Sequence, residues 1–318
     1  MRQIDNFING EFVASSVGRR FEKRSPVDNR VIASIAEAGQ PEVDQAVTAA
    51  KRALTGEWGK LATNERVDLL YQVADEITRR FDDFVDAEMA DTGQPQHVMS
   101  QVFIPRGAAN FKVFADIIKN VPTESFHMDT PDGRGALNYG VRVPKGVIGV
   151  VAPWNAPFLL MTWKVGPALA CGNTVVVKPS EESPLTATLL GEVMNKVGIP
   201  KGVYNVINGF GPDSAGEFLT RHKDVDAITF TGETRTGSAI MKAASDGIRD
   251  VSFEMGGKNA GIVFADCDFD KAIDGIFRSA FLNTGQVCLG TERVYVERPA
   301  FDRFVAALKD KVENVKFG

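Results

Sequence analysis

The sequence predicts an α/β fold built on a doubly wound, mostly parallel sheet. From residue 146 onward, short apolar runs typical of buried strands alternate with segments of helical periodicity. The expected strands cover 146–151, 174–178, 203–206 and 227–231, and the expected helices cover 158–170, 184–197, 213–221 and 235–246. Because parallel strands need crossover connections, this alternation indicates one sheet with helices on both of its faces.

The first ~130 residues predict mainly helices. Apolar side chains recur three and four positions apart within 67–77, 81–89 and 102–118. A run of turn-forming residues, 129–135, then precedes a strand-like run, 136–143. We therefore expect an extended hairpin that projects from the body.

A second unit is predicted to begin near Gly256 and Gly257. The expected elements are a strand over 261–264, a helix over 269–282, a strand over 293–296 and a helix from Pro299. A parallel sheet usually has more strands than this segment supplies. We expect the second domain to be incomplete.

Composition excludes several classes of protein. With 318 residues, 44% hydrophobic and 24% charged, the chain has an ordinary globular composition and is long enough for about two domains. The net charge of −5 argues against a nucleic-acid binder, whose surface should neutralise phosphates. No apolar stretch approaches the ~18 residues of a membrane-spanning helix, so we expect no membrane partner.

Cysteine and histidine usage narrows the chemistry further. Three cysteines cannot form a disulfide framework, which favours a reducing, cytoplasmic compartment in which a thiol can be reactive. Three histidines that lie far apart in the sequence leave few ligands for a metal, so we expect none.

Three residues could carry covalent chemistry. Cys288 lies in a polar, glycine-containing loop after a helix, where a thiol can be exposed and activated, although buried structural cysteines are common. Glu254 ends a strand before two glycines and could act as a general base or as a cap. Asn155, between Pro153 and Pro157, could stabilise an oxyanion or simply form a turn.

Other segments suit a cofactor. Lys178-Pro-Ser180-Glu181 follows a buried strand, at the edge where open α/β sheets bind ligands. Two glycine-containing runs lead into helices: Gly209-Phe-Gly211 with Gly216, and Phe230-Thr-Gly232-Glu233 onward to Gly237. Such glycines suit contact with phosphate, but ordinary helix-entry turns use the same residues.

Together, these segments resemble the aldehyde dehydrogenase superfamily, from about Phe7 to the last residue. The resemblance lies in the order and spacing of six motifs, with Cys288 following Glu254 by 34 residues. The motifs are Phe7-Ile-Asn-Gly-Glu-Phe-Val, Pro153-Trp-Asn-Ala-Pro, Lys178-Pro-Ser-Glu, Phe230-Thr-Gly-Glu, Phe253-Glu-Met-Gly-Gly-Lys-Asn and Gly285-Gln-Val-Cys.

The resemblance implies a fold and a set of domains. The fold would be aldehyde dehydrogenase-like, with a Rossmann-type NAD-binding domain over 1–124 and 145–255. Residues 125–144 would form a β-hairpin oligomerisation arm, and 256–318 the first part of an α/β catalytic domain. The whole protein would form a homodimer or homotetramer. Family members are longer, so the chain would cover about two thirds of one.

By the same resemblance, Cys288 would attack the aldehyde to give a thiohemiacetal. Asn155 and the Cys288 N–H would hold the oxyanion, and Glu254 would activate the water that hydrolyses the thioester. NAD would be preferred over NADP because Glu181 would repel a 2′-phosphate. The implied cofactor contacts are Trp154, Lys178, Ser180, Glu181, Gly211, Phe230, Gly232 and Glu233.

Three stretches, 224–234, 264–273 and 287–299, are most similar to the muconic-semialdehyde branch. That branch oxidises 2-hydroxymuconate or 2-aminomuconate 6-semialdehyde, each of which carries a carboxylate far from the aldehyde. Arg106 could bind that carboxylate with two hydrogen bonds, or could simply be a surface arginine. The implied aldehyde tunnel includes Leu160, Trp163 and Leu282. The alternatives are succinic semialdehyde or betaine aldehyde as substrate, or an inactive dinucleotide-binding fragment.

Overall fold

The computed structural model describes residues 2–316, which divide into two compact units. Unit 1 contains the chain up to Thr231 together with Arg235–Phe253. Unit 2 contains Gly232–Thr234 and the chain from Glu254 onward. The boundary therefore falls at Glu254, two residues before the predicted start of the second unit.

The centre of unit 1 is a seven-stranded sheet in the order β12-β11-β8-β9-β10-β2-β3. Neighbouring strands from β11 to β10 are all parallel, as predicted. These four lie where the apolar runs placed them: β8 (Val147–Val151), β9 (Thr174–Lys178), β10 (Tyr204–Val206) and β11 (Ala227–Gly232). The others are β2 (Asn6–Ile8), β3 (Glu11–Val13) and β12 (Asp250–Met255).

Helices cover both faces of this sheet, which confirms the doubly wound α/β prediction. One face packs on α3 (Thr63–Arg79), α4 (Phe81–Thr92), α6 (Ile104–Lys119), α7 (Pro157–Ala170) and α8 (Leu185–Lys196). The other packs on α1 (Gln40–Thr55), α9 (Ala215–Arg221) and α10 (Thr234–Ser245). Short helices α2 (Glu57–Lys60) and α5 (Gln96–Val98) and a π-helical turn (Met99–Phe103) connect them.

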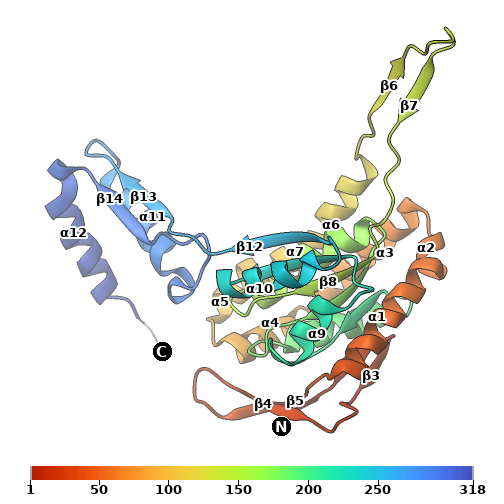
Figure 1. Cartoon of the computed structure of the whole chain (residues 1–318). Coiled ribbons are helices and arrows are strands. Elements are labelled where there is room, and N and C mark those ends of the chain that lie inside the picture. Colours follow the sequence, from red (N-terminus) through yellow and green to blue (C-terminus); the bar gives the residue numbers. More distant parts are fainter. Residues whose placement is uncertain (1, 317–318) are drawn as a thin grey trace. The chain divides into compact units, whose positions relative to one another are not determined.

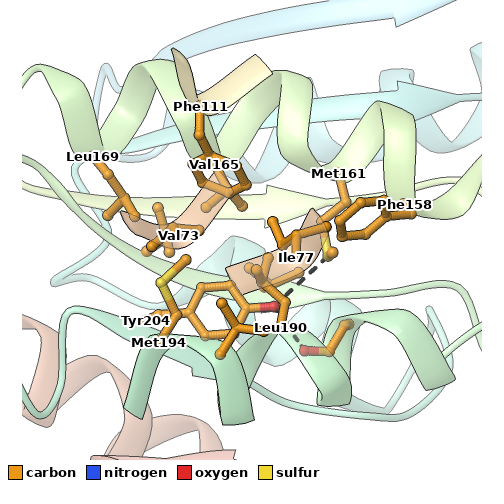
Figure 2. Close-up of a cluster of buried hydrophobic side chains, with 14 of the residues drawn as sticks. Val73, Ile77, Phe111, Phe158, Met161, Val165, Leu169, Leu190, Met194 and Tyr204 are labelled. Carbon is orange, nitrogen blue, oxygen red and sulfur yellow. Dashed lines mark hydrogen bonds between the residues drawn. The ribbon is translucent and has the colours of Figure 1, made fainter. Parts of the chain in front are cut away.

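Figure 2 shows part of the core between the sheet and the first of these helix layers. Val73, Met161 and Leu190 come from three different helices and meet around Tyr204 of β10. The buried Tyr204 hydroxyl donates to the Ala187 carbonyl oxygen at 2.9 Å, so its polar atom is satisfied. The α7 helix that follows the Asn155 loop is thus anchored by a packed core.

Residues 2–36 differ from the mainly helical prediction, which was wrong there. They form β2, β3 and a second sheet of β1 (Arg2–Ile4), β5 (Val31–Ala36) and β4 (Arg20–Arg24). Strands β1, β2 and β3 have three residues each, too few to show an alternating pattern, and the longer β4 and β5 were missed as well. Asn9 and Gly10, with φ of 54° and 80°, form the tight turn between β2 and β3. An Asn-Gly pair is a recognised hairpin signal and could have revealed these strands.

The predicted hairpin is confirmed. Strands β6 (Ser125–Met128) and β7 (Ala136–Tyr139) pair antiparallel, and the ribbon leaves unit 1 after α6 (Figure 1). The second strand ends at Tyr139, four residues earlier than predicted. Phe126, Leu137 and Tyr139 are each at least 60% exposed.

Unit 2 places a two-stranded parallel sheet, β13 (Ala260–Val263) and β14 (Arg293–Val296), beside two helices. These are α11 (Phe269–Phe281) and α12 (Arg298–Glu313), and all four elements occur within three residues of their predicted bounds. A 3-10 turn (Leu282–Gly285) follows α11. Among the described residues, no helix is long and apolar enough to cross a membrane.

Candidate active site

Three of the predicted site segments in unit 1 meet at the carboxyl edge of its sheet. The parallel register aligns Phe230 of β11 with Val151 of β8, and Val151 with Lys178 of β9. The loop that carries Trp154 and Asn155 therefore starts beside Lys178, and the Ala152 N–H donates to the Lys178 carbonyl at 3.1 Å. Strands β9 and β10 follow β8 on one side of it in the sheet, whereas the next strand along the chain, β11, lies on the other side of β8. The strand order therefore reverses between β8 and β11, and open α/β sheets bind ligands at such a switch point.

Polar groups of α4 and the residues after it hold the Asn155 loop. The Gln94 side-chain amide donates to the Asn155 carbonyl oxygen at 2.9 Å. Three residues on, the Phe158 N–H at the start of α7 donates to the buried Glu88 carboxyl at 3.1 Å. Burial raises the pKa of Glu88 to about 7, although the hydrogen bonds from Phe158 and Thr186 oppose the shift. The sequence analysis missed both Gln94 and Glu88.

Lys178 and Glu181 form an ion pair after β9. The Lys178 ammonium lies 2.8 Å from Glu181 Oε2, and only 6% of the lysine side chain is exposed against 34% of the glutamate. Burial lowers the pKa of Lys178, whereas the nearby lysine charge and its hydrogen bond outweigh burial at Glu181 and lower the pKa of that carboxyl. An ammonium donor beside a reachable carboxylate acceptor suits the two hydroxyls of a ribose.

The remaining cofactor candidates of unit 1 differ in exposure. Trp154 is 47% exposed and can contact a ligand. Ser180 is buried, and its hydroxyl accepts from the Glu182 N–H. Phe230 is also buried, with its ring edge-on to Phe253 at 6.0 Å, so its side chain belongs to the core. The Gly211 carbonyl accepts from the Glu217 N–H and closes the turn into α9.

Arg106 lies over the ring of Trp163, with its guanidinium carbon 5.3 Å from the ring centroid. Close packing of α6 on α7 sets this contact, since a Cβ at Gly107 would come within 2.4 Å of the Phe158 ring. Leu160, half-buried, lies on the same helix as Trp163. Among residues 2–316 no acidic side chain pairs with Arg106, so its charge is available to an anion.

The other predicted residues belong to unit 2. Cys288 is exposed as a free thiol, Glu254 is exposed at the end of β12, and Leu282 is 38% exposed. Gly232 and Glu233 also fall in this unit. The backbone before Cys288 is strained, because Asn283 and the β-branched Thr284 both have positive φ, 53° and 58°. Thus Cys288 and Glu254 share one unit, while Asn155 and the Lys178–Glu181 pair share the other.

Comparison with known proteins identifies the family to which this fold and these residues belong. The family model described as "Aldehyde dehydrogenase family" matches residues 12–318, and the chain belongs to that family. A Bacillus cereus aldehyde dehydrogenase solved as an NAD⁺ complex is 36% identical, with a TM-score of 0.94 over 100% of this chain and 64% of that one. A mutant aldehyde dehydrogenase from the same organism, also 36% identical, gives a TM-score of 0.96 over the same shares of the two chains.

Several curated relatives are more similar in sequence than these solved structures. A 2-hydroxymuconic semialdehyde dehydrogenase from Pseudomonas sp. (strain CF600) is 67% identical over all 318 residues. A protein of the same name from Pseudomonas putida is 63% identical, and a 2-aminomuconic 6-semialdehyde dehydrogenase from Pseudomonas sp. is 57% identical over 99% of the chain. The chain spans 65%, 65% and 64% of the lengths of these three relatives.

Proposed function

We propose that the protein oxidises 2-hydroxymuconate 6-semialdehyde to the corresponding acid with NAD. The observation that carries this proposal is the 67% identity, over the whole chain, to a protein named for that substrate. A 2-aminomuconate 6-semialdehyde activity is the second candidate, supported by the relative at 57% identity. No observation favours succinic semialdehyde or betaine aldehyde, and the activity assay below decides between an active enzyme and an inactive dinucleotide-binding fragment.

In the proposed chemistry, the Cys288 thiol loses its proton to solvent and the sulfur adds to the aldehyde carbon; a C–S bond forms while the C=O π bond opens to an oxyanion. The Asn155 amide and the Cys288 N–H donate to the resulting oxyanion. NAD, when bound, supplies the acceptor for the hydride that leaves this carbon. As the hydride leaves, the C=O bond re-forms and gives a thioester. Glu254 then takes a proton from water, the water oxygen attacks the thioester carbon, and the C–S bond breaks to release the acid. The proton on Glu254 passes to the departing sulfur and restores the thiol.

The cofactor assignment rests mainly on residues of unit 1. We assign the Lys178–Glu181 pair to the adenosine ribose, with Trp154, Ser180, Gly211 and Phe230 around the dinucleotide and Gly232 and Glu233 as further contacts. A carboxylate at Glu181 would repel a 2′-phosphate, so NAD is the expected cofactor. Accordingly, 1–124 and 145–255 form the proposed cofactor domain, 125–144 the oligomerisation arm, and 256–318 part of the catalytic domain. Assembly as a dimer or tetramer and a cytoplasmic location stay predictions.

Arg106 supplies the proposed substrate selectivity. It lies on the face of Trp163, has no acidic partner among the described residues and presents a planar fork suited to a carboxylate. Leu160 and Trp163, with Leu282, are the proposed lining for the apolar part of the substrate.

The test is NADH formation from 2-hydroxymuconate 6-semialdehyde, with 2-aminomuconate and succinic semialdehydes and betaine aldehyde for comparison. It uses the 318-residue chain, and the same chain joined to the part of the 67% identical relative that it does not span. We expect Cys288→Ser to lower kcat/KM at least about 1000-fold and Cys267→Ser, the control, to leave it unchanged. Absence of turnover in both forms would overturn the proposal.

Substitutions of Arg106 test the proposed substrate selectivity. Arg106→Ala should raise KM for the muconic substrate about 10- to 100-fold, because a charge-assisted bidentate contact is lost, and should hardly affect betaine aldehyde. Arg106→Lys keeps the positive charge but loses the planar fork, so its KM for the muconic substrate should lie between those of the wild type and Arg106→Ala. Equal effects of Arg106→Ala on both aldehydes would remove Arg106 from the substrate site.

A further inference from the structure

Asn259, the last residue of the Phe253–Asn259 motif, contacts the peptide of Cys288. Its side-chain Nδ2 donates to the Cys288 carbonyl oxygen at 2.8 Å and to the Gly290 carbonyl oxygen at 3.0 Å. Both acceptors are carbonyl oxygens, so the amide must present its NH₂ group, and its two hydrogens match the two partners.

The Asn259 backbone contacts the same segment again. Its carbonyl oxygen accepts from the Glu292 N–H at 3.0 Å and from the Arg293 N–H at 3.1 Å. One residue therefore binds the chain from Cys288 to Arg293 at four points. The side chain alone makes the two contacts nearest the thiol, because the backbone contacts fall at the start of β14.

Backbone atoms form a turn around Cys288, in which the Gly290 N–H donates to the Val287 carbonyl oxygen at 2.9 Å, and side-chain contacts follow farther along the loop. The Ser279 and Thr291 hydroxyls are 2.7 Å apart, and the Thr291 N–H donates to the Ser279 carbonyl at 3.1 Å. Lys258, next to Asn259, pairs with Glu292, but both side chains are more than 40% exposed. The Asn259 side chain, by contrast, donates directly to the Cys288 carbonyl oxygen.

We propose that Asn259 is a positioning residue for the nucleophile. Through its two side-chain hydrogen bonds it fixes the peptide that carries the Cys288 thiol to the short segment that also carries Glu254. The inference rests on the proposed function, since it gives this clamp a task in aldehyde oxidation. If Asn259 has this role, the segment from Glu254 to Asn259 supplies the base and also orients the nucleophile. The turn that precedes Cys288 is strained at Asn283 and Thr284, so the Asn259 hydrogen bonds would hold the Cys288 peptide in place beside a strained backbone.

The test compares three variants. Asn259→Ala removes both donors, and Asn259→Asp has nearly the same shape but places a carboxylate against two carbonyl oxygens. Lys258→Ala, the control, removes a neighbouring side chain that does not contact the Cys288 peptide. Hydrogen exchange is measured by mass spectrometry on the 318-residue chain, and kcat and KM on the forms used in the activity assay.

We expect both Asn259 variants to speed amide exchange over 288–293 at least about tenfold while exchange in α11 stays unchanged. We also expect kcat to fall about 10- to 100-fold with KM unchanged, since a small misplacement of a reacting group has effects of this size. Lys258→Ala should change neither quantity.

Unchanged exchange over 288–293 would overturn the clamp, whatever the activity. Faster exchange with kcat unchanged would overturn its role in the reaction. Absence of turnover in the wild-type protein would instead overturn the proposed function. The exchange experiment would still decide whether Asn259 holds the Cys288 peptide.

Discussion

The two units hold their candidate chemical groups by different means. In unit 1 the Asn155 loop and Lys178 leave strands whose side chains are buried between two helix layers. In unit 2 the buried apolar side chains of the described residues are Val263, Ile273 and Phe304, and hydrogen bonds from Asn259 secure the Cys288 loop. Packing fixes one set of groups and polar contacts fix the other, so the two sets should respond differently to substitution.

The largest expected effect concerns the small core of unit 2. Phe304→Ala should destabilise this unit by about 3–5 kcal/mol, because it removes the largest of its fully buried side chains. Hydrogen exchange should then lose protection throughout 254–316 while 147–231 keeps its own. The matched variant Phe111→Ala removes a ring from the larger core of unit 1 and should leave exchange in unit 2 unchanged. Equal loss in both units after Phe304→Ala would contradict the comparison.

A smaller effect is expected from the buried carboxyl beneath the Asn155 loop. The pKa of Glu88 rises from 4.5 to about 7 on folding because burial disfavours its charge. The folded state then binds more protons between these values, so stability should fall by roughly 3 kcal/mol as pH rises through this window. Glu88→Gln should flatten urea-derived stability over this range. An unchanged slope would mean that Glu88 does not carry the pH dependence.

The smallest effect is expected at the exposed ion pair of unit 2. Lys258 and Glu292 are 66% and 42% exposed, and pairs of this kind contribute less than about 1 kcal/mol. Lys258→Ala should therefore leave the urea midpoint nearly unchanged, with little dependence on salt. A loss comparable to that of Phe304→Ala would show that ion pairs, and not the core, hold this unit together.

Sequence patterns predicted the parallel sheet because its strands are continuous apolar runs, as in the fully buried β9. They failed in residues 2–36, where three of the five strands have only three residues each and strands such as β2 pair with a distant part of the chain. Motifs likewise pointed to Cys288, Glu254 and Asn155. Asn259 and Gln94 received no role, because each acts on a backbone carbonyl 29 and 61 residues away, and only the fold brings these groups together.

Amide exchange in the β6–β7 ribbon can report on self-association of this protein. A two-stranded ribbon with exposed faces is marginal in water, and its outer edges leave backbone donors and acceptors unpaired. Its amides should exchange quickly in dilute solution, and any association that covers the ribbon should slow them before it alters the cores. A dilution series followed by exchange at 125–139 would measure self-association without substrate, cofactor or turnover.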